Sequence, residues 1–201
     1  MNLGRHISED EMIAVFLRGE LDSGRYGPTL RSLIARDGRD EGVLRQPDLE
    51  DSETNSYRRG LLDEYRAYER REGLFQGFPE HVDWFRADLV PDEVLDIRFI
   101  NWDWWLRLTG GSRRPRDAAR RIRAGEFPGH TAAEHEPLAA ALVRTPGPPE
   151  LIAVTTPAHA PLVLVEGHFR LSAYALFPDY LPEQLEILLG ISDEMTSWRE
   201  F

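Results

Sequence analysis

The sequence predicts an α+β protein in which a mainly helical N-terminal half packs on a small mixed sheet. Over residues 1–110, apolar side chains recur mostly at the three- and four-residue spacing of amphipathic helices. Near the C-terminus, short apolar runs end at turn residues, which is typical of buried strands. We therefore expect a helical region over residues 1–110 and a strand-containing module over 111–201, which together can form one compact unit.

A capping box predicts the first helix. Ser8 is the N-cap and Glu11 the N3 residue, while Ile7 and Met12 have the spacing of a hydrophobic staple. This helix should continue to about residue 22.

Two further helices are expected before residue 75. Apolar positions 30, 33 and 34 predict a short helix, and the polar stretch 38–53 predicts a loop. A longer helix should run from residue 51 or 52 to about 71 and end at Gly73.

The middle of the chain is rich in aromatic residues. Residues 81–85 predict a brief helix, and Pro91 at the first helical position predicts another that continues to Leu106. At 100° per residue, Trp102 and Trp105 share one face of that helix, so at least one tryptophan is expected to line a cleft or an interface.

A basic helix is expected next, over residues 115–124, after a Gly-Gly turn. It belongs to a cluster of arginines: Arg113, Arg114, Arg116, Arg120, Arg121 and Arg123. The cluster is interpreted either as a solvated helix face or as a wall of a nucleotide or substrate site. A short apolar helix over 138–143 follows, and the Pro/Gly run 146–149 marks a boundary.

The C-terminal pattern predicts strand, strand, helix and strand in that order. The strands are expected at 151–154, 162–165 and 185–190, with the helix beginning near His168. Ser192 is expected to cap a last helix that reaches residue 198.

Composition excludes several kinds of chemistry. The chain has no cysteine, which excludes thiol catalysis and cysteine-ligated zinc. Every basic residue apart from histidine is arginine, so a Walker-type lysine and a Schiff-base lysine are also excluded. The net charge of -11 makes nucleic acid an unlikely partner. Without an apolar leader or a run of 18 apolar residues, the expectation is a soluble cytoplasmic protein that does not enter membranes.

The turn after the second strand is the candidate site. Glu166-Gly167 ends an apolar strand, and His168, Phe169 and Arg170 begin the helix. Helix N-termini bind anions through unpaired N–H groups, and a glycine lets the backbone approach a phosphate closely. His168 and Arg170 could add charge-assisted hydrogen bonds to the same oxygens.

The string Glu166-Gly167-His168-Phe169-Arg170 resembles the signature turn of the ParB/sulfiredoxin-like fold. It is most similar to the Asp-Gly-His-Thr-Arg of the free-serine kinase branch, with Glu for Asp and Phe for Thr. The partition proteins, with Gly-Glu-Arg-Arg, share only Gly167 and Arg170. The resemblance covers roughly the last 55 residues and implies a nucleotide phosphate held at this turn.

The resemblance implies roles for individual residues. Gly167, His168, Phe169 and Arg170 would hold ATP, ADP or CTP, and Glu166 would ligate Mg²⁺ or accept a proton. Catalytic roles fall to Glu166, His168 and Arg170. Beyond the motif, we expect one arginine of the basic cluster, Arg113, to help bind the nucleotide. We expect Trp102 and Trp105 to line the substrate pocket. The kinases use a separate acid as general base; Glu93, Asp96 and Asp103 are possible by chain order alone.

Two functional interpretations stay open. The first is a phosphotransferase or nucleotide hydrolase that acts on a small-molecule substrate. The second is a non-catalytic module in which the turn binds a nucleotide as a switch, or binds nothing, and the helical half recruits a protein. An enzyme should place Glu166, Arg170 and a second acid around one cleft. A third interpretation, DNA binding by the arginine helix, requires that helix to be free of acidic neighbours. The sequence leaves the oligomeric state open.

Overall fold

The computed structural model describes residues 1–127, 131–144 and 151–201. Its helices, in chain order, are α1 (Glu9–Leu21), α2 (Gly27–Arg36), α3 (Gly42–Arg45), α4 (Ser52–Arg66), α5 (Pro91–Val94), α6 (Asp103–Thr109), α7 (Pro115–Arg123), α8 (Ala132–Arg144) and α9 (His168–Leu176). Short 3-10 turns lie at Gly73–Phe75, Pro178–Tyr180 and Met195–Ser197.

The described strands form one mixed sheet of five strands. They are β1 (Asn2–Ile7), β2 (Asp83–Leu89), β3 (Ile152–Thr155), β4 (Val163–Glu166) and β5 (Leu185–Ile191), in the spatial order β1-β2-β5-β3-β4. All neighbours are antiparallel except β3 and β5, which are parallel. The predicted α+β class, with helices packed on a small mixed sheet, is confirmed.

Alternating side chains bury both faces of the sheet. One face presents Trp84, Ile152, Val154, Val163, Val165 and Leu188. The other presents Ala87, Leu89, Ala153, Leu164, Ile187 and Leu189. The period of two residues follows from strand geometry, and it explains why β3 to β5 read as continuous apolar runs.

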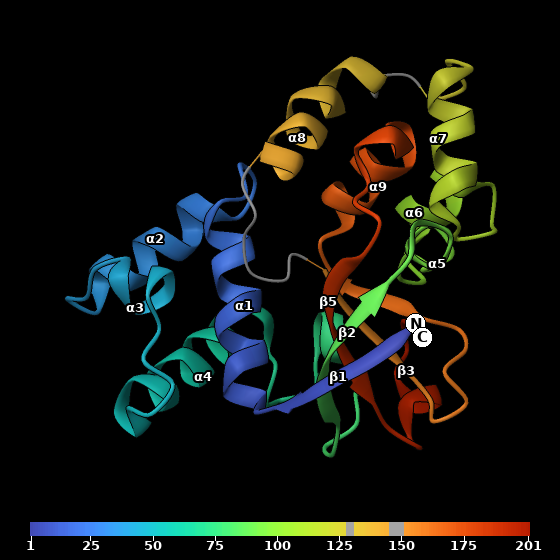
Figure 1. Ribbon diagram of the computed structural model, residues 1–201. Coiled ribbons are helices and arrows are strands. Elements are labelled where there is room, and N and C mark those ends of the chain that lie inside the picture. The colour runs from blue at the N-terminus through green and yellow to red at the C-terminus, as the bar shows by residue number, and fades with distance from the viewer. Residues whose placement is uncertain (128–130, 145–150) are drawn as a thin grey trace.

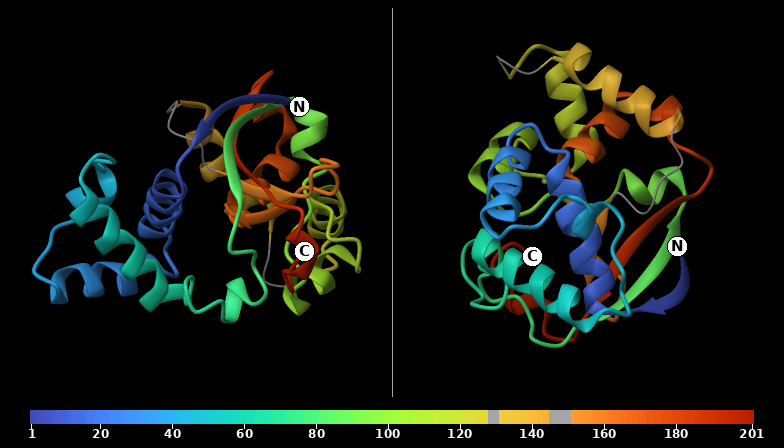
Figure 2. Two further views of the ribbon diagram at one scale, coloured as in Figure 1. Left: turned by 90° about the horizontal axis from the view of Figure 1, so that it is seen from below. Right: turned by 90° about the vertical axis from the view of Figure 1, so that its left-hand side faces the viewer.

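Helix α1 covers the first face, and its own outer side packs against α2 and α4 (Figure 1). Figure 2 shows α2, α3 and α4 extending beyond α1, on the side away from the sheet. The second face is covered by α7 and α9, which contact each other, and α8 packs on α9. Helix α1 therefore lies between the sheet and the other N-terminal helices.

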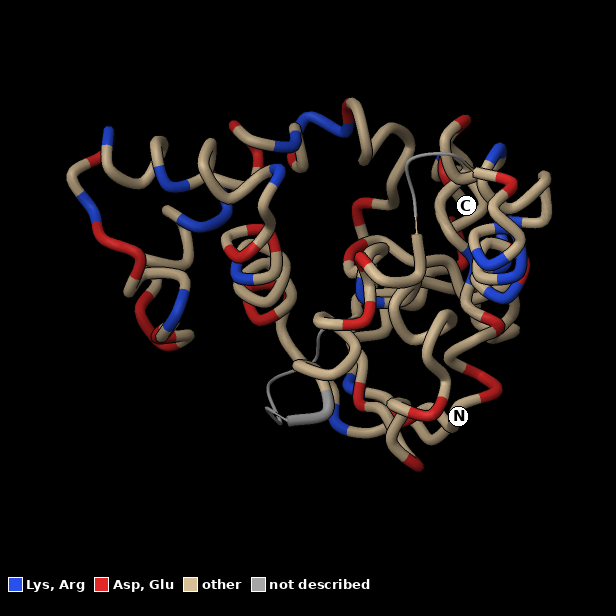
Figure 3. Tube along the Cα trace, turned by 90° about the horizontal axis from the view of Figure 1, so that it is seen from above, with Lys and Arg blue, Asp and Glu red and all other residues tan. Residues whose placement is uncertain are grey.

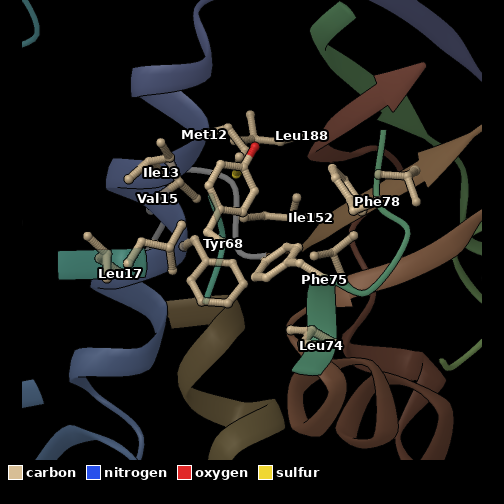
Figure 4. Close-up of a cluster of buried hydrophobic side chains, with 14 of the residues drawn as sticks. Met12, Ile13, Val15, Leu17, Tyr68, Leu74, Phe75, Phe78, Ile152 and Leu188 are labelled. Atoms are coloured by element: carbon tan, nitrogen blue, oxygen red, sulfur yellow. The ribbon is translucent and has the colours of Figure 1, made fainter. Parts of the chain in front are cut away.

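An aromatic cluster packs beside α1 in the core, between the helix and the strands (Figure 4). Phe75 makes edge-to-face contacts with Tyr68, at 4.7 Å between ring centroids, and with Phe78, at 5.4 Å. The Tyr68 hydroxyl donates a 2.6 Å hydrogen bond to Glu9, so even the polar end of this buried ring is paired.

Strands β1 and β2 correct two expectations. Residues 81–85 do not form a brief helix: β2 begins at Asp83 and pairs along its whole length with β5. Pairing with β1 and β5 on its two sides outweighs any local helical preference. Strand β1 was not predicted, because residues 2–6 are exposed and show no apolar alternation. The sheet therefore draws strands from both sides of the expected boundary at 110/111.

The continuous helix expected from Pro91 to Leu106 is also wrong. Helix α5 ends at Val94 and α6 begins at Asp103. Between them Arg98 donates to Leu162 and accepts from Leu164, each at 2.8 Å, so the chain runs beside β4. Ile97 and Phe99 are fully buried in this extended segment, and that burial stabilises it against helix formation.

Other predicted boundaries of helices and loops differ from those in the structure. Helix α4 ends at Arg66 rather than near residue 71, since Ala67 takes a left-handed conformation that terminates it. Within the stretch 38–53, expected to be a loop, α3 forms one turn. The last helix expected after Ser192 is reduced to the turn Met195–Ser197. The boundary predicted at 146–149 lies outside the described residues.

Among the helices of the described ranges, none has both the length and the apolar character needed to cross a bilayer.

Candidate functional site at the Gly167 turn

The turn between β4 and α9 has the backbone geometry of an anion cradle. Gly167 takes φ +99°, a value that side-chain-bearing residues rarely adopt, and it precedes the nine-residue α9. No side chain of the described residues caps this helix, so the N–H groups of its first turn are not taken up by a cap. The predicted strand, glycine turn and helix are therefore present.

Helix α1 packs directly against this turn. Arg170 donates a 3.2 Å hydrogen bond to the Gly19 carbonyl and a 3.3 Å bond to Glu166. A methyl group added at Gly19 would lie 3.0 Å from the Glu166 Oε1 and 3.2 Å from an Arg170 nitrogen. Glycine at position 19 thus allows α1 to approach the Glu166–Arg170 ion pair.

Next to Gly19, Glu20 brings a second carboxylate to the turn. It is 4% exposed, and burial, followed by the negative charge of Glu166, raises its pKa to about 7. Two carboxylates in one poorly solvated place resist simultaneous ionisation. The sequence analysis did not single out Glu20, because it lies in the interior of an amphipathic helix with no motif around it.

Glu20 is held by residues of α4. Arg66 forms an ion pair with it, and the Tyr65 hydroxyl donates to it at 3.2 Å. The Arg66 guanidinium lies over the Tyr26 ring at 4.0 Å and the Tyr65 ring at 4.6 Å. We call Glu20, Arg66, Glu166, His168 and Arg170 the ionisable cluster.

His168, another member of the cluster, is neutral at pH 7. Burial, then the positive charge of Arg66, lowers its pKa to about 3. The residue keeps some exposed surface, but its Nε2 is buried and has no hydrogen-bond partner among the described residues. The ring stacks on Trp105 at 5.1 Å, and Trp105 stacks on Phe99 at 4.1 Å. Trp105 therefore lies beside the turn, and its role in binding a substrate stays a prediction.

Two other predicted site residues gather elsewhere. The Arg113 guanidinium donates to three backbone carbonyls: Phe99 at 2.7 Å, Phe201 at 2.5 Å and Glu200 at 2.7 Å. Trp102, 37% exposed, lies near the Glu200 side chain. Arg113 precedes α7 with φ +61°, so it does not belong to the face formed by Arg116, Arg120 and Arg123.

Phe169 points away from the ionisable cluster. It is 51% exposed and stacks on His135 of α8 at 4.3 Å between ring centroids. Only its backbone N–H remains available to the turn.

Acidic residues accompany the arginines of α7 (Figure 3). Arg116 pairs with Asp92 at 2.6 Å, Arg120 with Asp117 at 2.8 Å, and Arg121 with Glu126 at 2.9 Å. Arg123 donates to the Leu176 carbonyl. The condition for DNA binding, a helix free of acidic neighbours, is therefore not met.

Few side chains at the turn could ligate a divalent cation. In the described ranges, no three His, Asp or Glu side chains converge as a metal site would require. Mg²⁺ commonly uses one or two carboxylates together with substrate phosphates and water. Glu166 would fit that smaller requirement once it is released from its ion pair with Arg170.

The site combines the N-terminus of α9 with two arginines, two carboxylates and a neutral histidine ring that stacks on aromatic side chains. Such perturbed pKa values on neighbouring groups are typical of acid–base sites, although ion pairs such as Glu20–Arg66 also stabilise structure. Comparison with protein-family models, curated proteins and solved structures finds no match to this chain. The ParB/sulfiredoxin-like resemblance stays a prediction that rests on the motif.

Proposed function

We propose that the chain is a nucleotide-binding phosphotransferase or nucleotide hydrolase that acts on a small metabolite, with the phosphates held at the Gly167 turn. The observation that carries the proposal is the position of Glu20. A second acid with a pKa of about 7 lies beside Glu166 and Arg170, although it comes from a helix near the other end of the sequence. The second acid supports an enzymatic role for the turn over a purely structural one.

Phosphate binding would use the first turn of α9. The N–H groups of His168, Phe169 and Arg170 and the positive end of the helix dipole favour an anion there. Arg170 now makes bonds of 3.2 and 3.3 Å, longer than the 2.7–2.9 Å common for charge-assisted bonds to phosphate. A phosphate group can therefore replace Gly19 and Glu166 as its partner, and α1 would shift to admit it.

Glu20 would act as the general base. With a pKa of about 7, both protonation states are populated at neutral pH, which suits proton transfer. The hydroxyl of the acceptor gives its proton to the ionised Glu20 while its oxygen bonds to the terminal phosphorus. The bond from that phosphorus to the bridging oxygen breaks, and the electron pair leaves with the nucleoside phosphate. Water as the acceptor gives hydrolysis.

The remaining residues would bind and orient. Neutral His168 can donate one N–H to a phosphate oxygen, and its stack on Trp105 fixes the ring. Released from Arg170, Glu166 is the residue placed to hold Mg²⁺, whose chemistry is to neutralise charge on the phosphates.

Hydrolysis of ATP or CTP with Mg²⁺, followed as release of inorganic phosphate across pH 5 to 9, tests the proposal. We expect the rate to rise through about pH 7. Glu20→Gln should lower it at least about 100-fold and remove that rise. Glu69→Gln, an exposed carboxylate on the segment after α4, is the matched control and should change neither.

Two outcomes would contradict the proposed reaction. If nucleotides bind without turnover in the wild type, the non-catalytic switch is the better account. If Glu20→Gln keeps the wild-type rate and pH profile, Glu20 is a structural partner of Arg66 only.

A further inference from the structure

A polar cavity lies well away from the Gly167 turn along the chain, between α2 and the first turns of α4. Its volume is about 470 Å³, within the range of small-molecule sites. It is lined by Gly38, Arg39, Asp40, Gly42, Val43, Gln46, Asp48, Asp51, Thr54 and Arg58.

Arg58 is the buried end of this cavity. It is 1% exposed, and its pKa is lowered by burial. Its terminal nitrogens donate to the Val43 carbonyl at 3.2 Å and the Asp48 carbonyl at 2.8 Å, and to the Asn55 side chain. These bonds hold the α2–α4 connection in place but bring no negative charge to the guanidinium.

Two features of Arg58 indicate an absent partner. Its Nε is buried, and no atom of the described chain accepts a hydrogen bond from it. Asp10, Asp51 and Asp48 attract its charge, but none of them forms an ion pair with it among the described residues, and burial outweighs their effect on its pKa. A buried cation without a paired anion is costly, and a carboxylate ligand would remove that cost.

The rim of the cavity carries the opposite charge. Asp40 and Asp48 are exposed, and each uses one oxygen to accept a backbone N–H, from Gly42 at 2.6 Å and Glu50 at 2.9 Å. Asp51 caps α4, and its backbone hydrogen bonds lower its pKa, so it is ionised at neutral pH. Arg39, the other cation of the lining, is paired with Glu53 at 2.9 Å.

We infer that this cavity binds a small zwitterion, with its carboxylate toward Arg58 and its ammonium group among Asp40, Asp48 and Asp51. A simple anion would be repelled by three carboxylates at the rim, and a simple cation would meet Arg58 at the base. A ligand that carries both charges is complementary to the acidic rim and to the basic end of the cavity. The site is independent of the function proposed for the Gly167 turn.

The test uses β-alanine as the zwitterion, with propionate and ethylammonium as ligands that keep one charge each. Binding is measured by calorimetry and by saturation-transfer NMR at millimolar concentration. Because Arg58 also holds the loops together, the variant changes the rim: Asp40→Asn with Asp48→Asn. Asparagine keeps the acceptor oxygen that each turn needs and removes only the charge.

We expect wild type to bind β-alanine at least about tenfold more tightly than propionate or ethylammonium. The double variant should weaken β-alanine binding by about tenfold and strengthen propionate binding. Glu183→Gln, an exposed carboxylate before β5, should change neither. Absence of β-alanine binding to wild type, or an unchanged affinity in the double variant, would overturn the inference.

Discussion

The backbone carbonyl of Gly19 accepts a 3.2 Å hydrogen bond from Arg170, so the last turn of α1 rests on the first turn of α9. This contact joins two segments from opposite ends of the chain. It also places Glu20, the residue after Gly19, beside Glu166. The candidate site is therefore assembled by tertiary packing of α1 rather than by the C-terminal motif alone.

Two helical glycines provide a matched test of that contact. Gly60 in α4 has open space where a side chain would be, so Gly60→Ala should raise the free energy of unfolding by about 1 kcal/mol. Gly19→Ala should gain less, because the methyl group would lie 3.0 Å from Glu166. Urea denaturation of both variants measures the difference. Equal gains would mean that α1 does not press on the Glu166–Arg170 pair.

The pH dependence of stability should contain two opposing contributions from the ionisable cluster. Glu20 has a raised pKa when folded, so its contribution is present below pH 4.5 and is lost as the pH rises through about 7. His168 has a lowered pKa, so its contribution is present above pH 6.5 and is lost as the pH falls toward about 3. Between pH 4.5 and 6.5 the two slopes have opposite signs.

Single variants separate these contributions. Relative to wild type, Glu20→Gln should become more stable with rising pH over 4.5 to 7, by about 3 kcal/mol in total. His168→Asn should show the reverse trend from pH 4.5 to 6.5. Urea denaturation in steps across that range measures both trends, and parallel curves for wild type and variants would contradict the assigned shifts.

Arg113 is expected to act in folding rather than in nucleotide binding. Its guanidinium donates to the Phe99, Glu200 and Phe201 carbonyls, so Arg113→Met should lower the free energy of unfolding by about 3 kcal/mol. Arg114→Met, at the exposed neighbouring arginine, should cost little. Nucleotide affinity should be unchanged in folded Arg113→Met. A selective loss of nucleotide binding would return Arg113 to the site.

Ion pairs should keep α7 from binding nucleic acid. We expect no salt-dependent binding of duplex DNA to wild type at low ionic strength, since Arg116, Arg120 and Arg121 are each paired with a carboxylate. Removing the partners with Asp92→Asn, Asp117→Asn and Glu126→Gln together should produce such binding. Fluorescence anisotropy of labelled DNA tests both, and wild-type binding that weakens with salt would reopen the DNA interpretation.

Much of the local structure was predictable from the sequence. Ser8 caps α1, β3 and β4 follow their apolar runs, and Gly167 starts α9, because each depends on nearby residues. Strands β1 and β2 were not predictable, since their pairing partners are distant and β1 is exposed. Glu20 could not be predicted for the same reason, because it is far in the sequence from the Gly167 turn. In the sequence it looks like an ordinary residue of an amphipathic helix, and only the packing of α1 against the turn distinguishes it.

The most direct test of the account is calorimetric titration of the purified chain with ATP, ADP and CTP, each with and without Mg²⁺. Wild type should bind at least one nucleotide. Arg170→Met should weaken that binding by about 1.5 to 3 kcal/mol, the value of one charge-assisted hydrogen bond. Arg199→Met, at an exposed arginine near the C-terminus, should not weaken it. Absence of nucleotide binding to wild type would contradict the proposed function and leave the Gly167 turn a structural element.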